Sequence, residues 1–366
     1  KEFFYNLKVG FNKKNYLFQV DNHPKSTQIF NNKYPFFTEK SKYMVKHFKN
    51  FFIWLKKNYL KKGDKVIEIG SNDGTFSSYF SKSKFNILGF EPSLNVAKIA
   101  RKKKLRVISK FFNYKNISKL RNYKKKTNLI CAANVICHIP NLKDLIKCID
   151  FLLSDNGVFI FEEPYLGSMF KKISYDQIYD AHVFIFSLHS VRSVFNAYGF
   201  ELINAFPQKT HGGSMRYVIS RKNVKVISKN IKKLIKKEKK LKLNNISSCL
   251  KFKKNCELSR KKFIKKIMFY KSNGKSIAGY AASAKSSTVF NYCNIGPNII
   301  DYIADSTEEK IGKYSPGKHI PVKSIDFFRK NSTDVAILCS WNHKKEIIQK
   351  EKKFKKNGGI WITHVK

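Results

Sequence analysis

A glycine-bracketed turn directly after a short apolar run constrains the fold of this chain more than any other feature. Residues 66–69 read Val-Ile-Glu-Ile, a short and mostly apolar run typical of a strand buried on both faces of a sheet. Gly70 and Gly74 then bracket a tight turn into a helix from about Thr75. Glycine suits these positions because a ligand must approach the backbone closely there and some φ angles can be positive. The pattern predicts a strand, a ligand-binding loop and a helix in succession.

A second strand end adds an acidic residue to this loop. The run at 86–91 ends in Glu91, about twenty residues after the glycine turn. A carboxylate at that place can accept both hydroxyls of an adenosine ribose. The spacing differs from the Gly-x-Gly-x-x-Gly of dinucleotide enzymes, so it favours a cofactor without a pyrophosphate, of which S-adenosylmethionine is the commonest. The candidate cofactor-binding residues are Glu68, Gly70, Ser71, Asn72, Asp73, Gly74, Glu91 and Asn134.

Strand and helix patterns alternate along most of the chain, which predicts an α/β fold with a parallel sheet covered on both faces. We expect a Rossmann-like sheet of the class I methyltransferase type, with about seven strands. Its strands and helices are expected near 51–60, 65–70, 75–83, 86–91, 94–103, 128–133, 141–152, 157–162, 187–198, 200–206 and 215–221. A smaller C-terminal α/β domain is expected to start near 275, with elements at 276–280, from 284, and near 299–304, 334–339, 343–355 and 359–364.

The charge of the chain is large but evenly spread. Lys and Arg total 73 against 25 for Asp and Glu, a formal net charge of +48, and most of the cations are lysine. Sequence-specific nucleic-acid proteins rely on arginine for base contacts, whereas Lys here accompanies much Asn, Ile, Phe and Tyr, as AT-rich codons would produce. We therefore expect no specific nucleic-acid partner. The positive field would still attract a diphosphate-bearing substrate.

Several sequence features bear on location. No apolar stretch reaches the roughly 18 residues of a membrane span, and no signal peptide is visible. None of the seven cysteines forms a Cys-x-x-Cys pair, which favours reduced, buried thiols in a cytoplasmic protein. The first residue is Lys1 rather than Met, which raises the possibility of a fragment. We expect a cytoplasmic protein with no membrane partner, and the sequence gives no oligomeric state.

Motifs further along the chain resemble the sugar C-methyltransferase family, which methylates a ring carbon of nucleotide-linked 4-keto deoxysugars with S-adenosylmethionine. The motifs lie, in the family's order, at 134–140, 163–166, 175–187, 210–216, 279–285, 291–293 and 312–321. The resemblance implies a transferase of deoxysugar biosynthesis whose partner is a nucleotide-diphosphate sugar. It also divides the chain into a remnant of an N-terminal module (1–50), a methyltransferase domain (51–222), a helical connector (223–270) and a nucleotide-sugar-binding domain (271–366).

The family usually carries an N-terminal zinc module, and this chain departs from it. Asn12 and Asn15 occupy the two positions where the family has Cys-x-x-Cys. Neutral amides are poor zinc ligands beside thiolate or imidazole. We therefore predict no zinc and no other metal site.

The resemblance assigns the catalytic residues. Carbon methylation needs a base that removes a proton next to the ketone, a donor that stabilises the enolate oxygen, and close positioning. The family pattern places the base on His182, whose ordinary pKa leaves it mostly neutral at pH 7. Tyr179 would donate to the enolate oxygen. His138 follows the end of an expected strand, where ligands bind in such sheets, so it would contact the substrate or the enolate. The family usually has Glu where this chain has Ala181, and adjacent Asp180 points in a different direction.

The remaining candidates are substrate contacts. Tyr34 lies in a segment similar to one that reaches the family's active site, although Phe36 lacks the usual hydroxyl. Residues at the start of the expected C-terminal helix would bind phosphate through free N–H groups. The full set of candidate substrate-binding residues is Tyr34, His211, Ser283, Lys285, Lys313, Tyr314 and His319.

Each assignment has an alternative. His182 can be a hydrogen-bonded histidine ahead of a strand, Tyr179 and His138 can be packed rings, and the glycine turn can be an ordinary turn. The whole chain can be a binding or assembly protein that descends from the enzyme and lost activity through Ala181. A nucleic-acid methyltransferase is favoured only by the charge, and we find no Asn/Asp-Pro-Pro-Tyr motif.

Overall fold

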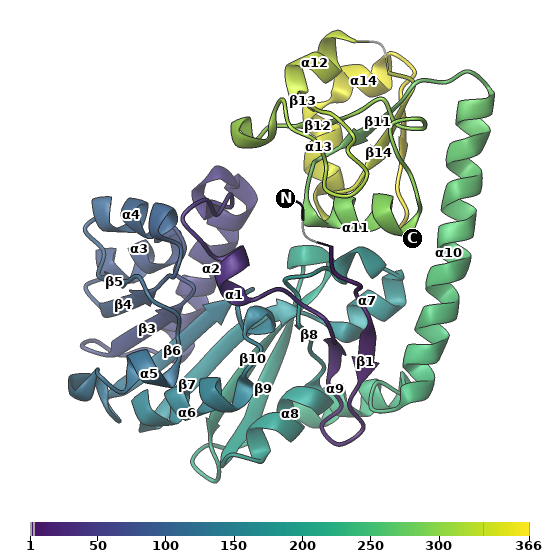
Figure 1. Cartoon of the computed structure of the whole chain (residues 1–366). Helices are drawn as coiled ribbons and strands as arrows, with labels where there is room; N and C mark the ends of the chain where they lie inside the picture. Colours follow the sequence, from purple (N-terminus) through teal and green to yellow (C-terminus); the bar gives the residue numbers. More distant parts are fainter. Residues whose placement is uncertain (1, 3, 332, 366) are drawn as a thin grey trace.

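The computed structural model describes residues 2, 4–331 and 333–365. Within these residues three sheets form, and the larger two belong to two α/β units joined by a long helix (Figure 1). The predicted fold class is confirmed. The largest sheet has seven strands in the order β5-β4-β3-β6-β7-β10-β9. These strands are β3 (Lys65–Ile69), β4 (Asn86–Phe90), β5 (Val107–Ile108), β6 (Thr127–Ala133), β7 (Leu153–Pro164), β9 (Phe200–Gln208) and β10 (Ser214–Arg221).

The pairing within this sheet is that of a doubly wound fold with one inserted strand. Neighbours from β5 to β7 are parallel, whereas β10 lies antiparallel between β7 and β9. The helices of this unit are α2 (Lys42–Asn58), α3 (Thr75–Lys82), α4 (Leu94–Lys102), α5 (Tyr114–Ile117), α6 (Leu142–Leu152), α7 (Leu166–Lys172) and α8 (Leu188–Asn196).

Alternate side chains of the sheet build two separate cores. Val66 packs in a cluster with α2 and α3 on one face, while Ile67 and Ile69 pack with α6 and α8 on the other. Helices therefore cover both faces of the sheet, and the carboxyl ends of its strands are the expected place for a ligand.

Helix α2 begins earlier than the sequence pattern indicated. The expected helix started at residue 51, but α2 starts at Lys42 because the Ser41 side chain accepts a hydrogen bond from the Met44 N–H at 3.3 Å and caps it. Met44 and Phe48 then extend the buried stripe of this helix. The helix thus crosses the expected boundary between residues 50 and 51.

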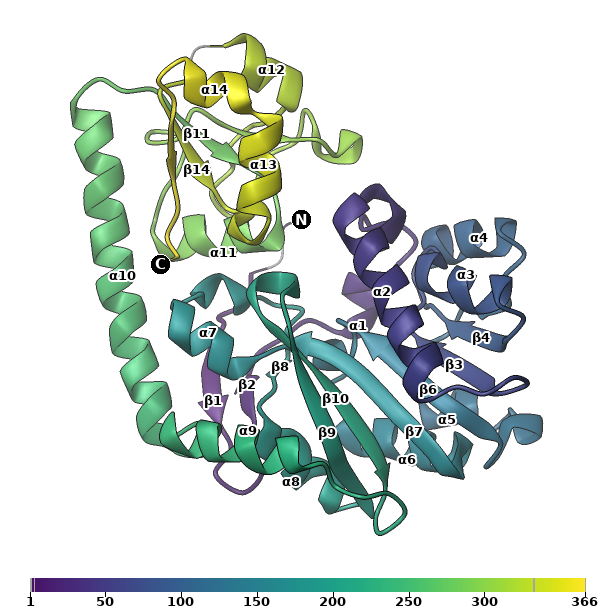
Figure 2. The same ribbon diagram turned by 180° about the vertical axis from the view of Figure 1, so that it is seen from behind.

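Two helices connect the large unit to the second α/β unit. They are α9 (Lys229–Lys240) and α10 (Ile246–Ser272), and α10 runs along the side of the molecule between the two units (Figures 1 and 2). The second unit has a parallel sheet in the order β13-β12-β11-β14-β15. Its elements are β11 (Ile277–Tyr280), α11 (Ala284–Tyr292), β12 (Tyr302–Asp305), β13 (Val322–Ser324), α12 (Ile325–Lys330), β14 (Val335–Leu338), α13 (Lys344–Lys350), α14 (Lys352–Lys356) and β15 (Ile360–Ile362).

The N-terminal segment joins the fold through a small sheet. Strand β2 (Phe18–Val20) lies between β1 (Val9–Phe11) and β8 (Phe184–Ile185), antiparallel to both. In the turn between β1 and β2, Asn12 Oδ1 accepts from the Lys14 N–H at 2.9 Å, so this amide caps a turn. A short helix, α1 (Ser26–Ile29), follows.

The structure also bears on membrane spans and on the state of the cysteines. No helix among the described residues has the length and apolarity needed to cross a membrane. The seven cysteines are free thiols, and six of them are buried.

Candidate active site

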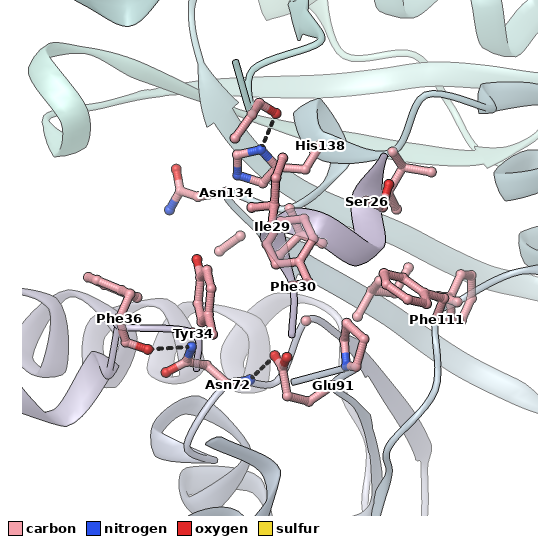
Figure 3. Close-up of a pocket in the computed structure, with 18 of the residues that line it drawn as sticks. Ser26, Ile29, Phe30, Tyr34, Phe36, Asn72, Glu91, Phe111, Asn134 and His138 are labelled. Atoms are coloured by element: carbon pink, nitrogen blue, oxygen red, sulfur yellow. Dashed lines mark hydrogen bonds between the residues drawn. The ribbon is translucent and has the colours of Figure 1, made fainter. Parts of the chain in front are cut away.

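A cavity of about 860 Å³ lies at the carboxyl ends of β3, β4 and β6, and residues of the N-terminal segment and of the C-terminal unit also line it. Figure 3 shows part of this lining, with Tyr34, Asn134 and His138 among the labelled residues. The size of the cavity is that of a ligand pocket, and strand carboxyl ends are the expected place for one. The candidate residues that line it are Tyr34, Glu68, Gly70, Ser71, Asn72, Glu91, Asn134, His138, Tyr179, His182, His211 and Ser283. The candidates that do not line it are Asp73, Gly74, Lys285, Lys313, Tyr314 and His319.

The two loop glycines adopt the backbone conformation that the sequence suggested. Gly70 has φ 68° and Gly74 has φ 77°. A Cβ on Gly70 would collide with the side chain of Val135, and a Cβ on Gly74 would meet Leu105 and Ala100. The turn therefore needs glycine both for its φ angles and for space.

We expect Gly74→Ala to lower the free energy of unfolding by about 2–4 kcal/mol, because a left-handed φ costs about 1–2 kcal/mol and crowding adds to it. Gly63→Ala is the matched control: its φ is 88°, but a Cβ there would meet nothing within 4 Å. In the control, the free energy of unfolding is expected to fall only by the cost of the left-handed φ angle. Urea unfolding followed by circular dichroism measures both, and equal losses would contradict the crowding at residue 74.

Glu91 is fixed at the wall of the cavity by backbone donors. Its Oε1 accepts from the Ser93 N–H at 2.8 Å and its Oε2 from the Asn72 N–H at 3.0 Å. Burial raises the pKa of this carboxyl, and the bonds from Ser93 and Asn72 act against the rise. Each oxygen keeps a lone pair that a ribose hydroxyl could use, and the cofactor contact of Glu91 stays a prediction.

The side chains of Asn72 and Asp73 hold the N-terminal segment. Asn72 Oδ1 accepts from the backbone N–H and the hydroxyl of Thr38, both at 3.0 Å, and its Nδ2 donates to the Phe36 carbonyl at 3.2 Å. Asp73 Oδ2 accepts from the Glu39 N–H at 2.8 Å. Asp73 therefore faces the N-terminal segment instead of the cavity, and its cofactor contact stays a prediction.

Glu68 lies beneath the loop as a buried carboxyl. The hydroxyl of Ser77 in α3 donates to it. Burial raises the pKa of Glu68 to about 8, so the group is mostly protonated at pH 7. It can then donate as well as accept hydrogen bonds.

Asn134 sits at the end of β6 with φ 57°, and its Oδ1 is buried without a partner among the described residues. The turn after it is held by Glu163, whose Oε1 accepts from the N–H groups of Val135 at 2.8 Å and Ile136 at 2.6 Å. Burial raises the pKa of Glu163 to about 7. Sequence reasoning quoted Glu163 only within a motif. An acidic residue at the carboxyl end of an apolar strand was the signal for it. An unpartnered acceptor beside Gly70 fits a cationic amine such as that of S-adenosylmethionine.

His182 has a defined tautomer. Its Nδ1 lies 2.8 Å from the Gln177 carbonyl, which can only accept, so Nδ1 carries the hydrogen. Its Nε2 is then the acceptor, and the Tyr179 hydroxyl donates to it at 2.5 Å. Burial lowers the pKa of His182 well below its usual range, and nearby His138 contributes in the same direction. The imidazole is therefore neutral at pH 7 and has a basic nitrogen at the cavity.

His138 repeats this arrangement on the facing segment. Its Nδ1 donates to the Ala181 carbonyl at 2.5 Å, which again leaves Nε2 as an acceptor. Its ring centroid lies 5.2 Å from that of His182 and 5.5 Å from that of Phe30. Burial lowers the pKa of His138. Position 181 thus orients one histidine through its backbone, although its side chain is only a methyl group.

The imidazole pair has a cysteine beside it. Possible ligand atoms of Cys137, His138 and His182 lie within 4.8 Å of one another. Burial raises the pKa of Cys137 well above its ordinary value, so the thiol keeps its proton. A bound metal ion would itself deprotonate such a thiol, so the absence of a metal site stays a prediction.

The N-terminal segment supplies one wall of the cavity (Figure 3). Tyr34 is fixed through its carbonyl, which accepts from Asn95 Nδ2 at 2.8 Å, and burial raises the pKa of its phenol. The ring of Phe30 packs against that of Tyr34, with the two ring centroids 5.4 Å apart. Sequence reasoning missed Phe30, because nothing in the local pattern distinguished it from other aromatic residues.

The C-terminal candidates divide into two groups. Ser283 lines the cavity and caps α11, where its Oγ accepts from the Ser286 N–H at 3.4 Å. His211 also lines it, with Nε2 buried and unpartnered among the described residues, and burial lowers its pKa to about 3. Lys285 points elsewhere: its Nζ lies 3.4 Å from Asn342 Oδ1 and 3.8 Å from Asp176 Oδ2.

Three candidates lie in the loop between β12 and β13, outside the cavity. His319 Nε2 is 2.8 Å from the Glu2 carboxylate, and Tyr314 is 65% exposed. Lys313 is exposed in the same loop. A substrate contact by any of the three stays a prediction.

Two known protein families match this chain, one over each half. Residues 38–205 match the family of methyltransferase domains, and residues 209–365 match a family described as the C-methyltransferase C-terminal domain. Both matches are to methyltransferase families, which confirms the enzyme class expected from the motifs, an S-adenosylmethionine-dependent C-methyltransferase.

One characterised protein is similar to most of this chain. C-methyltransferase NovU from Streptomyces niveus is 27% identical over 307 residues, covering 84% of this chain and 73% of NovU. Among solved structures, PH0226 protein from Pyrococcus horikoshii OT3 has 18% identity and a TM-score of 0.42 over 51% of this chain and 94% of its own. Magnesium protoporphyrin IX methyltransferase from Synechocystis PCC 6803 with bound S-adenosylmethionine has 14% identity and a TM-score of 0.36, over 48% and 79%.

Proposed function

We propose that this enzyme methylates a ring carbon of a nucleotide-linked 4-keto deoxysugar, by base-promoted enolate formation and in-line methyl transfer. The single observation that carries the proposal is His182, a cavity-lining neutral imidazole whose Nδ1–H donates to a carbonyl and whose Nε2 accepts from Tyr179. Methyl transfer to oxygen or nitrogen has a lone pair to start from, whereas transfer to carbon needs such a base. The motifs shared with sugar C-methyltransferases supply the substrate class.

His182 would remove the proton next to the ketone. In the structure the Tyr179 hydroxyl donates to Nε2 of His182, so this hydroxyl has to turn toward the substrate before Nε2 can take a proton from carbon. The same rotation of the Tyr179 side chain would bring its hydroxyl to the ketone oxygen, where it stabilises the enolate charge. Burial raises the pKa of Tyr179 well above its ordinary value, which keeps the phenol protonated as a donor.

Bound S-adenosylmethionine would supply an electrophilic methyl group. Glu91 would hold the ribose and Asn134 the amine, with Gly70 leaving room for the adenosyl group. The sugar would then lie between this pocket and the two histidines, under the wall formed by Tyr34 and Phe30.

The two α/β units would have different roles. Residues 51–222 would hold the cofactor and the base, and residues 271–366 would hold the nucleotide, with residues 223–270 as the connector and 1–50 as the remnant of an N-terminal module. The free thiols and a nucleotide-sugar substrate favour a cytoplasmic location in deoxysugar biosynthesis.

The pH dependence of kcat/KM tests the state of the base. Because burial lowers the pKa of His182 well below its usual range, the neutral form persists as the pH falls from 8 to 6, and we expect kcat/KM to change less than about twofold. An imidazole with an ordinary pKa near 6.5 would lose about three quarters of its neutral form at pH 6. A limb with its midpoint at or above pH 6.5 contradicts the assignment, provided that cofactor affinity, measured in parallel, stays constant.

The substrate proposal is tested by incubating the enzyme with labelled S-adenosylmethionine and the thymidine, cytidine and guanosine diphosphate 4-keto-6-deoxy sugars. Label in a carbon-methylated sugar, found by mass spectrometry, is the expected result. Deuterium uptake from D₂O at the ring carbon next to the ketone reports the base alone. Absence of both with all three sugars overturns the proposal.

A second function is favoured by one observation, the missing carboxylate at Ala181. A relative that binds nucleotide sugars or acts in assembly without turnover would have this defect. Asp180 lines the cavity beside it, and burial raises the pKa of its carboxyl. If Ala181→Glu raises methylation from an undetectable level, the chain is an impaired relative. A nucleic-acid methyltransferase has only the net charge of +48 in its favour.

A further inference from the structure

A carboxylate at the junction of the two units has no part in the proposed chemistry. Asp176 lies in the 3-10 turn Tyr175–Gln177, and its side chain is 0% exposed. Its Oδ2 accepts from Trp341 Nε1 at 2.8 Å. Its Oδ1 lies 3.0 Å from His364 Nε2, but the two atoms form no hydrogen bond, so this contact is one of charge proximity alone. Lys285 Nζ approaches Oδ2 to 3.8 Å. All three partners belong to the C-terminal unit, so we call these four residues the interdomain clamp.

The clamp requires an ionised aspartate. Trp341 and Lys285 are pure donors, so a carboxylate that only accepts matches both of them. Burial alone would raise the pKa of Asp176, but the neighbouring His364 and Lys285 outweigh burial and hold it below its usual range. A buried charge is costly when one partner is removed, so the clamp holds its residues in one arrangement.

The clamp holds the segment that carries the proposed base. Three residues after Asp176 is Tyr179, and six residues after it is His182, whose ring is tied to the Gln177 carbonyl of the same turn. Gln177 Nε2 also donates to the His211 carbonyl at 2.6 Å. The turn is therefore fixed to the next cavity-lining segment as well.

The C-terminal side of the clamp lies next to residues that line the cavity. Lys285 is the second residue of α11, directly after Ser283 and Ala284, which line the cavity. Thr288 of the same helix donates to the Ile178 carbonyl at 3.4 Å. The ring of Trp341 fills the space where a Cβ on Gly212 would be, beside His211.

We infer that Asp176 is a positioning residue: through Trp341 and Lys285 it sets the catalytic turn 175–182 against the start of α11, so that the unit proposed to hold the nucleotide places the base over the sugar. This inference rests on the proposed function. Asp176 touches neither cofactor nor substrate in it, and its effect passes through the position of His182. The expected consequence is a loss in the proton-removal step without a loss in cofactor binding.

Three variants of the full chain test the inference. In Asp176→Asn the side chain keeps its shape and one acceptor but loses its charge. Trp341→Phe removes the indole N–H, and the double variant closes a mutant cycle. The control is Glu238→Gln, another fully buried carboxylate, which accepts from the N–H groups of Leu188 at 2.7 Å and His189 at 3.0 Å, far from the turn in sequence.

We expect Asp176→Asn to slow deuterium uptake by the sugar 10- to 100-fold, and Trp341→Phe to slow it 3- to 10-fold. The double variant should be no slower than Asp176→Asn alone, since both changes act through one contact. The Kd for S-adenosylmethionine should stay within twofold in all variants. Glu238→Gln should lower the melting temperature but leave uptake within twofold. Uptake that stays unchanged in folded Asp176→Asn, or in Trp341→Phe if the former does not fold, overturns the inference.

A second measurement separates this inference from the proposed function. Hydrogen–deuterium exchange of backbone amides, followed by mass spectrometry without substrate, should rise in peptides covering 175–182 in Asp176→Asn and stay constant in peptides covering 65–75. If the wild type turns over no sugar, the proposed function fails, and this readout alone decides the clamp. Unchanged exchange at 175–182 overturns the inference even where the wild type is active.

Discussion

Replacing His182 by alanine is expected to slow deuterium uptake at the sugar carbon next to the ketone by about 10²- to 10⁴-fold, the usual contribution of a general base. The reason is that Nε2 of His182 is the acceptor nitrogen of a neutral imidazole, while Nδ1 is occupied by the Gln177 carbonyl. Methyl transfer should fall by a similar factor, because the enolate is its nucleophile. Mass spectrometry of the sugar after incubation in D₂O measures the first rate, and labelled cofactor measures the second.

His182→Asn is the matched variant for this experiment. An asparagine amide can still donate to the Gln177 carbonyl, so the turn keeps one of its hydrogen bonds, but it has no basic nitrogen. Both variants should bind S-adenosylmethionine within twofold of the wild type. If uptake survives in either folded variant, His182 is not the base.

Replacing Glu91 by alanine is expected to raise the Kd for S-adenosylmethionine roughly 30- to 1,000-fold. This corresponds to about 2–4 kcal/mol, the loss of two hydrogen bonds from the ribose hydroxyls to a charged acceptor. The carboxylate is already oriented by the N–H groups of Asn72 and Ser93, so little entropy is lost on binding. Isothermal titration calorimetry measures the change.

Glu91→Gln serves as the control, because it keeps the size of the side chain and one acceptor oxygen. We expect its Kd to lie between those of the wild type and Glu91→Ala. Deuterium uptake by the sugar, measured without cofactor, should change little in either variant. An unchanged Kd in Glu91→Ala would remove this residue from the cofactor site.

The main elements of the fold were predictable because their signals are local. The apolar run before Gly70 and the periodic pattern after Thr75 each follow from neighbouring residues, and the structure places β3 and α3 there. The strand expected directly after His182 is β8. The strands that were missed, β1, β2, β5 and β13, have only two or three residues each. Such strands depend on a partner far away in the sequence, so no local period announces them.

Most of the candidate site residues line the cavity, but the hydrogen bonds that orient them could not be predicted from the sequence. Motifs brought His138, Tyr179 and His182 to one cavity, but the tautomer of each histidine depends on carbonyls that only the folded chain brings close. Asp73 and Lys285 show the limit of motif reasoning, since they sit within the right segments but face other partners. Side-chain direction at the end of a strand or helix is set by tertiary contacts.

The small sheet attaches β2 directly to the segment that follows His182, the proposed base. Strand β2 pairs with β8, and β8 starts two residues after His182. In addition, the Val20 N–H donates to the Val183 carbonyl at 2.8 Å, one residue from the imidazole. Removing the first twenty residues would remove the strand that pairs with β8 next to His182. We therefore expect the shortened protein to lose methyl transfer while its adenosyl pocket stays intact.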